Sequence, residues 1–143
     1  MEHVKDNVYV ELISPGCNVG IIATPMGTLI VDTPLVSRQA KAISDELAAG
    51  GHEPVRFIVL THHHGDPILG TGLFGEATLV IGNRLVYENM GGHSPSWVEQ
   101  WAQSWEWENP GDVREMMTAR IPRPHIVFEG ELTLHLGGVD VRL

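Results

Sequence analysis

The chain has 143 residues, of which 43% are apolar and 19% are charged, as is typical of one globular domain. Nine basic and eighteen acidic residues give a net charge of −9, and so acidic a surface repels nucleic-acid phosphates, which argues against nucleic acid as a partner. No run approaches the roughly 18 consecutive apolar residues that a membrane span requires, so a membrane is not expected as a partner either.

The first third of the chain predicts strands at 8–13, 19–23 and 28–31, because these runs are rich in β-branched residues and end at turn residues. A helix is expected next, with Ser37 as its N-cap and its end at Gly50. Between these two residues apolar side chains recur at three- and four-residue steps. The run 55–60 is the most hydrophobic of the chain and predicts a buried strand.

Beyond residue 60 the pattern predicts further strands and helices. A strand is expected at 78–81 and a short helix at 83–89. The region 95–121 is helical in character but broken at 109–111, and we treat 83–121 as a helical insert. The last strands are expected at 126–128, 132–136 and 139–143. This order predicts an α/β (α+β) fold in which helices pack on one face of a mixed sheet.

Three consecutive histidines directly follow the most hydrophobic run. In an extended segment alternate side chains point the same way, so His62 and His64 can converge on one ion while His63 points to the opposite side. Gly65 lets the chain bend and bring Asp66 toward the same point. These donors suit catalytic zinc, and iron or manganese fit them as well. A histidine-rich surface loop is the competing interpretation, which the position after a buried strand disfavours.

The sequence Thr61-His62-x-His64-x-Asp66 after a hydrophobic strand resembles the metal motif of the metallo-β-lactamase superfamily. The resemblance covers essentially the whole chain and includes Val31-Asp32-Thr33, Leu69-Gly70 and the segment 128–138. It implies half of a four-layer αββα sandwich that another chain completes, with metal ions at the edge where the two halves meet.

The same resemblance implies a single partial domain, 1–143, whose residues 61–70 form the metal loop. It also implies that His62 and His64 hold the first metal ion and that Asp66 holds a second. The implied cofactor is one or two zinc ions, with iron and manganese as alternatives.

Two features depart from the family pattern. Pro67 stands where the motif usually carries a further histidine, so a second metal site is expected to be weakened or absent. The family's later ligands would lie beyond Leu143, whereas catalytic zinc normally takes three protein ligands. We therefore expect a second, different polypeptide to supply the C-terminal half of the fold and the remaining ligands. The alternative is a piece of a longer protein. The remaining histidines within reach are His93, His125 and His135. A strand position for His135 and a surface position for His125 disfavour both as ligands, whereas the loop position of His93 lets it approach the site.

Tryptophans are the other conspicuous residues. Trp97, Trp101 and Trp105 fall on one face of a predicted helix, and packing of that face against the core is the simpler interpretation. The functional interpretation is a helix that caps the site, with Trp97, Trp101 and His93 lining the substrate.

These features predict a subunit of a metal-dependent hydrolase that attacks a small molecule with metal-bound hydroxide. Asp66 is the expected catalytic carboxylate, and Asp32 is expected to fix a ligand histidine from behind. Resemblance in size and layout to two-subunit ether hydrolases of the superfamily implies an activated aromatic ether, such as a nitroaromatic methyl ether that releases methanol. Alternatives are a thioester, lactone or β-lactam substrate, or a non-catalytic subunit that stabilises a metallohydrolase partner. The polar N-terminus and the lone Cys17 predict a cytoplasmic location.

Overall fold

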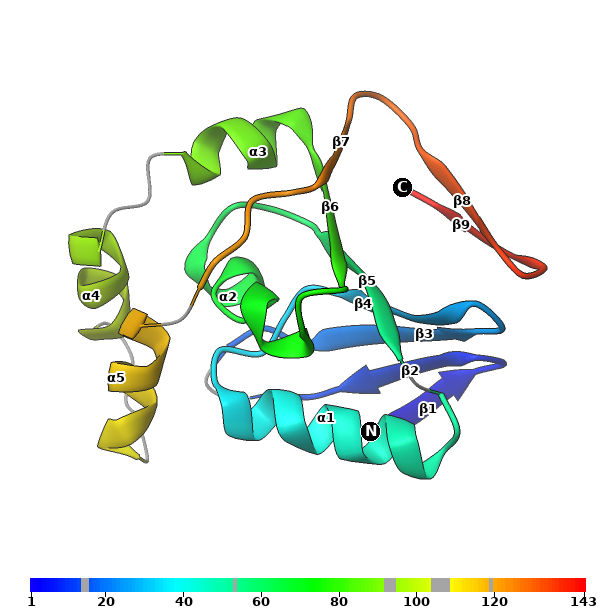
Figure 1. The fold of residues 1–143 in the computed structure, drawn as a ribbon, viewed down its shortest axis with the longest axis horizontal. Coiled ribbons are helices and arrows are strands. Elements are labelled where there is room, and N and C mark those ends of the chain that lie inside the picture. Colours follow the sequence, from blue (N-terminus) through cyan, green and yellow to red (C-terminus); the bar gives the residue numbers. More distant parts are fainter. Residues whose placement is uncertain (14–15, 53, 92–94, 104–108, 119) are drawn as a thin grey trace.

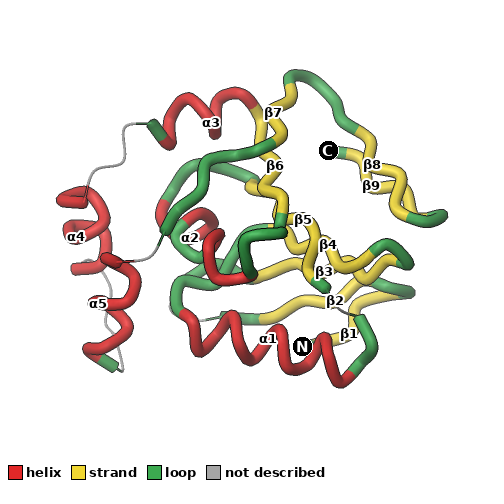
Figure 2. Tube along the Cα trace, viewed as in Figure 1, coloured by secondary structure: helices red, strands yellow, loops and turns green. Residues whose placement is uncertain are grey.

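The computed structural model of the chain describes residues 1–13, 16–52, 54–91, 95–103, 109–118 and 120–143. A seven-stranded sheet and a separate two-stranded hairpin form its β structure (Figure 1, Figure 2). The large sheet contains, in both chain and spatial order, β1 (Glu2–Lys5), β2 (Val8–Glu11), β3 (Val19–Thr24), β4 (Gly27–Val31), β5 (Val55–Leu60), β6 (Leu79–Asn83) and β7 (Ile126–Phe128). The hairpin consists of β8 (Thr133–Leu136) and β9 (Val139–Arg142). The helices are α1 (Ser37–Ala49), α2 (Gly65–Ile68), the 3₁₀ helix η1 (Thr71–Phe74), α3 (Arg84–Met90), α4 (Pro95–Gln103) and α5 (Pro110–Thr118).

The large sheet changes from antiparallel to parallel at β4. Strands β1 to β4 pair antiparallel, whereas β4 to β7 pair in parallel. The carboxyl ends of β4, β5, β6 and β7 therefore lie at one edge of the sheet, which we call the carboxyl edge. In open sheets this edge is where binding sites form. Asp32, which follows β4, and Thr61, which follows β5, both lie there.

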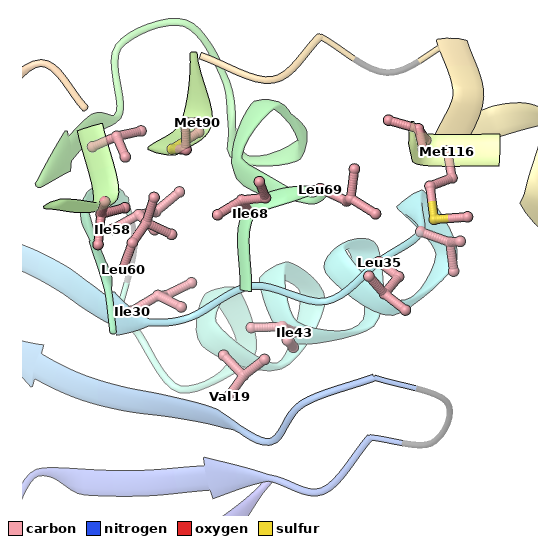
Figure 3. Close-up of a cluster of buried hydrophobic side chains, with 14 of the residues drawn as sticks. Val19, Ile30, Leu35, Ile43, Ile58, Leu60, Ile68, Leu69, Met90 and Met116 are labelled. Carbon is pink, nitrogen blue, oxygen red and sulfur yellow. The ribbon is translucent and has the colours of Figure 1, made fainter. Parts of the chain in front are cut away.

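Helices cover one face of the sheet. Ile30 and Ile58 on the central strands point into a core that also buries Ile43 of α1 (Figure 3). Val80 of β6 and Leu47 of α1 belong to the same buried cluster. Each such side chain stabilises the fold by about 1.5–3 kcal/mol on burial. Within the described part of the chain, no helix is both long enough and apolar enough to cross a bilayer.

The hairpin lies against the opposite face of the sheet. Leu29, Val59 and Ile81 point to that side and form a second buried cluster with Leu136 of β8 and Val141 of β9. The predicted α/β fold, a mixed sheet with helices on one face, is confirmed by this arrangement.

The start of α1 corrects one prediction. Ser37 is the first helical residue, and Val36 is the N-cap, with no side-chain cap of its own. The backbone N–H of Ser37, which has no partner within α1, donates instead to Oε1 of Glu115 on α5, at 3.1 Å. A glutamate from a distant helix thus takes the role that local sequence assigned to a serine hydroxyl.

Candidate metal centre

The histidine cluster lies at the carboxyl edge, in the loop between β5 and α2. The rings of His62 and His64 have their centroids 4.9 Å apart and stand at 90° to each other. Asp66, in α2, places Oδ1 3.9 Å from Nε2 of His62. The side chains of His62 and Asp66 are 43% and 26% exposed, so ions from solvent reach them. The structure thus places the ring of His64 and the carboxylate of Asp66 each near His62.

The prediction for His63 was wrong. Residues 61–64 do not form a strand, and α2 begins at Gly65 with His64 as its N-cap. The ring of His63 lies 5.0 Å from that of His64, centroid to centroid, and not on the opposite side of the chain. The ring of His64 thus contacts the rings of both His62 and His63.

Asp32 holds the first residue of the metal loop. Its backbone φ is 63°, in the left-handed region that aspartate tolerates better than most residues. Its side chain accepts the backbone N–H of Thr61 at 2.9 Å and the hydroxyl of Thr61 at 2.7 Å. Burial raises the pKa of the Asp32 carboxyl above its ordinary value, and the two hydrogen bonds from Thr61 oppose that rise.

Thr61 connects Asp32 to the histidines. Its Oγ1 lies 2.8 Å from Nδ1 of His62 as well as 2.7 Å from Asp32. The sequence predicts a supporting role for Asp32 but none for Thr61, although Thr61 is the first residue of the motif. A residue with a hydroxyl directly before the first histidine, together with an aspartate at the end of the neighbouring strand, is the sequence feature that indicates this role for Thr61.

The other side of the metal loop is fastened by Cys17 and Thr33. The Cys17 thiol donates to the backbone oxygen of Asp66 at 3.2 Å, and the Thr33 hydroxyl donates to that of Pro67 at 2.8 Å. Burial, with the nearby Asp32 and Asp66 carboxylates, raises the pKa of the Cys17 thiol to about 12. The Cys17 thiol is therefore protonated at neutral pH and can donate, and its hydrogen bond and that of Thr33 hold the backbone of the metal loop in place.

Pro67 is buried in α2, and its side chain has no atom that could bind a metal ion. No group of three or more His, Cys, Asp or Glu side chains in the described ranges is arranged to hold a metal ion. The two imidazoles and the Asp66 carboxylate fit zinc by their chemistry, and their arrangement is that of a partial ligand set.

The remaining predicted site residues do not join the metal loop. Trp97 is half-buried and packs against the main core, which favours the packing interpretation. His93, Trp105 and the side chain of Trp101 lie outside what the structure describes. His125 accepts the backbone N–H of Val80 through Nδ1, and His135 pairs with Asp140 on the hairpin at 2.7 Å.

Comparison with known proteins identifies the family to which this fold belongs. The model of the metallo-beta-lactamase superfamily matches residues 15–143, and the chain therefore belongs to that superfamily. Members of the superfamily are typically metal-dependent hydrolases. A search of curated protein sequences finds no match.

Solved structures of the superfamily share the fold. The inverting sec-alkylsulfatase Pisa1 from Pseudomonas sp. superposes with a TM-score of 0.74 at 15% identity, over 98% of this chain and 26% of its own. BJP-1, a subclass B3 metallo-beta-lactamase of Bradyrhizobium japonicum, superposes with a TM-score of 0.63 at 18% identity, over 94% of this chain and 47% of its own. FIM-1 from Pseudomonas aeruginosa, solved in its mono-zinc form, superposes with a TM-score of 0.51 at 16% identity, over 63% of this chain and 44% of its own. This chain therefore spans between about a quarter and a half of their lengths.

Proposed function

We propose that this chain is the metal-binding half of a zinc-dependent hydrolase, in which His62 and His64 hold one zinc ion. The observation that carries the proposal is the meeting of these two rings, 4.9 Å apart, with Asp66 3.9 Å from His62 at the carboxyl edge. Membership of the superfamily supports it, and so does the mono-zinc form in which FIM-1 was solved.

The chain's own residues have distinct roles in this proposal. A bound zinc ion lowers the pKa of its water to about 7, which supplies a nucleophile at neutral pH. Asp66 lies beside His62 and either orients the attacking water, takes up its proton, or holds a second ion. Asp32 and Thr61 hold the start of the loop from the buried side. Because Pro67 adds no ligand, one zinc ion is the expected stoichiometry.

A second, different polypeptide completes the site in this proposal. Catalytic zinc takes three protein ligands, and two imidazoles supply only part of that set. The sheet face that carries the hairpin extends to β2, where Val8 is paired with Ile22 and is still 36% exposed. An apolar face that the hairpin covers only in part suits a packing partner.

The proposed substrate is an activated aromatic ether, such as a nitroaromatic methyl ether cleaved with release of methanol. The support is the resemblance in size and layout to a subunit of the two-subunit dinitroanisole O-demethylase. Thioesters, lactones and β-lactams are the alternative substrates, since the same nucleophile adds to a carbonyl. The sulfate esters suggested by Pisa1 belong in the same assay panel.

Native mass spectrometry with metal analysis of the complex purified from its source tests the proposal. We expect this chain, a second polypeptide and zinc in one particle, and hydrolysis of at least one member of the panel. Replacing His62 and His64 together by alanine should remove the zinc and lower the activity at least about 100-fold. His135→Ala is the matched control, because His135 lies on the exposed face of the hairpin.

The rival function is a non-catalytic subunit that stabilises a metallohydrolase partner, and Pro67 is the observation that favours it. Full activity and unchanged zinc content in the double histidine variant of the assembled complex would establish the rival and overturn the proposal.

A further inference from the structure

We infer that Thr61 is a positioning residue that fixes the tautomer of His62, with the proton on Nδ1 and the lone pair of Nε2 free for the metal ion. The metal part of this inference rests on the proposed function. The tautomer itself is a property of the metal-free chain and is tested separately.

The hydroxyl hydrogen of Thr61 is committed to Asp32. An ionised carboxylate only accepts hydrogen bonds, and Oδ2 of Asp32 lies 2.7 Å from Oγ1 of Thr61. The backbone N–H of Thr61 donates to the other oxygen of the same carboxylate at 2.9 Å. These two bonds fix both the backbone and the hydroxyl of Thr61 on a carboxylate that is 8% exposed. The hydroxyl has no second hydrogen to donate.

The hydroxyl oxygen of Thr61 keeps its lone pairs, and one of them faces His62. Oγ1 lies 2.8 Å from Nδ1 of the ring, and two lone pairs at that distance repel, so Nδ1 carries the proton and donates it to Oγ1. A neutral imidazole has a single N–H, and its other nitrogen is then the free ligand atom. That nitrogen, Nε2, is the atom 3.9 Å from Oδ1 of Asp66. The series Asp32–Thr61–His62 therefore presents a ligand atom on the Asp66 side of the ring.

His125 provides the opposite case within the same chain. Its Nδ1 accepts the backbone N–H of Val80 at 2.9 Å, so its proton is on Nε2 when the ring is neutral. The two histidines differ in what faces Nδ1: a hydroxyl already engaged as a donor at His62, and an amide donor at His125. His125 is thus an internal reference for the tautomer of His62.

Long-range ¹H–¹⁵N NMR spectra of the metal-free, full chain test the tautomer, recorded at about pH 8, where histidine is neutral. His62→Gln identifies the signals of His62. We expect proton on Nδ1 of His62 and on Nε2 of His125 in the wild-type chain. Thr61→Ser keeps the hydroxyl and should keep the tautomer, whereas Thr61→Val should move the proton of His62 to Nε2. Thr133→Val, an exposed position on β8, is the matched control and should change neither signal.

Zinc affinity, measured by competition with a chromophoric chelator, tests the consequence. Loss of a partner that orients a ligand histidine typically weakens metal binding about 10- to 100-fold, which we expect for Thr61→Val. Thr61→Ser should restore affinity to within about threefold of wild type, and unchanged His125 signals in both variants show that the sheet remains folded.

Two results would overturn the role of Thr61: a wild-type His62 with its proton on Nε2, or a Thr61→Val chain that keeps the wild-type tautomer or the wild-type zinc affinity. A wild-type chain with the proton on Nδ1 that binds no zinc, alone or in its complex, supports the tautomer assignment and removes the proposed function instead.

Discussion

Arg38 and Asp112 form an ion pair that ties α1 to α5 across 74 residues of sequence. Both Nε and Nη2 of Arg38 contact Oδ2 of Asp112, at 3.0 and 2.9 Å. The side chain of Asp112 is only 4% exposed, whereas that of Arg38 is 49% exposed. Together with the bond from Ser37 to Glu115, this pair fixes α5 against the beginning of α1, next to the segment that leads from β4.

Removing the arginine should destabilise the chain through the aspartate left behind. We expect Arg38→Met to lower the free energy of unfolding by about 1.5–3 kcal/mol, because the variant leaves a buried carboxylate without its cationic partner. Urea unfolding measures the change. Lys41→Met is the matched control, since it removes the exposed pair with Asp45 and should cost less than about 1 kcal/mol. Equal losses in the two variants would mean that the pair does not hold α5 in place.

Gly70 closes the metal loop where no other residue fits. A Cβ at this position would lie 1.7 Å from the backbone oxygen of Pro34, so the loop or the segment after β4 would have to move. We expect Gly70→Ala to cost at least about 3 kcal/mol and to weaken zinc binding in the same variant. Gly111→Ala, whose nearest new contact is the side chain of Asn109 at 3.2 Å, should be tolerated. Thermal unfolding compares the two, and a stable Gly70→Ala chain would show that the close approach is not essential.

Local pattern predicted the elements that this loop joins. The strand 55–60 and the loop after it follow from one apolar run and the polar residues that end it, and β5 has those bounds. The repeat of Ala40, Ile43 and Leu47 predicted the helix whose buried residues they are. The meeting of His62 and His64 also followed from near neighbours in sequence.

What sequence could not predict depends on contacts between distant residues. β1 was missed because all four of its residues are exposed, so no apolar alternation marks it. The capping of Ser37 by Glu115 and the thiol of Cys17 against Asp66 join residues that the fold alone makes neighbours. The predicted position of His63 was wrong because its ring lies 5.0 Å from that of its neighbour His64, whereas neighbouring side chains of an extended strand point to opposite sides.

The buried carboxyl of Asp32 should make the free energy of unfolding depend on pH. Burial raises its folded-state pKa above the unfolded value of about 3.9, so the folded chain binds the proton more tightly than the unfolded chain. The stability from this group is then full below about pH 3.9 and is lost as pH rises through the folded pKa. Asp32→Asn removes the titration and keeps a residue that tolerates the left-handed φ.

The measurement is urea unfolding of the metal-free wild-type and Asp32→Asn chains at a series of pH values. The free energy of unfolding of the wild type minus that of the variant should fall as pH rises above about 4. It should level off once the Asp32 carboxyl is ionised in both the folded and the unfolded chain. Subtracting the two free energies cancels the contribution of the other carboxylates, which are the same in both chains. A difference that rises with pH would mean that the hydrogen bonds from Thr61 outweigh the cost of burial.

The thiol of Cys17 should be unreactive while the metal loop is folded. With its pKa raised to about 12, the thiol is almost wholly protonated at pH 8, whereas an unfolded cysteine with a pKa of about 8.5 is partly thiolate. We expect reaction with a disulfide reagent to be at least about 100-fold slower in the folded chain than in urea. Gly70→Ala should reduce this ratio of rates if it displaces the metal loop, because the Cys17 thiol donates to the backbone oxygen of Asp66 in that loop. Rapid reaction of the native wild-type chain would show that the loop opens readily and that Cys17 does not hold it.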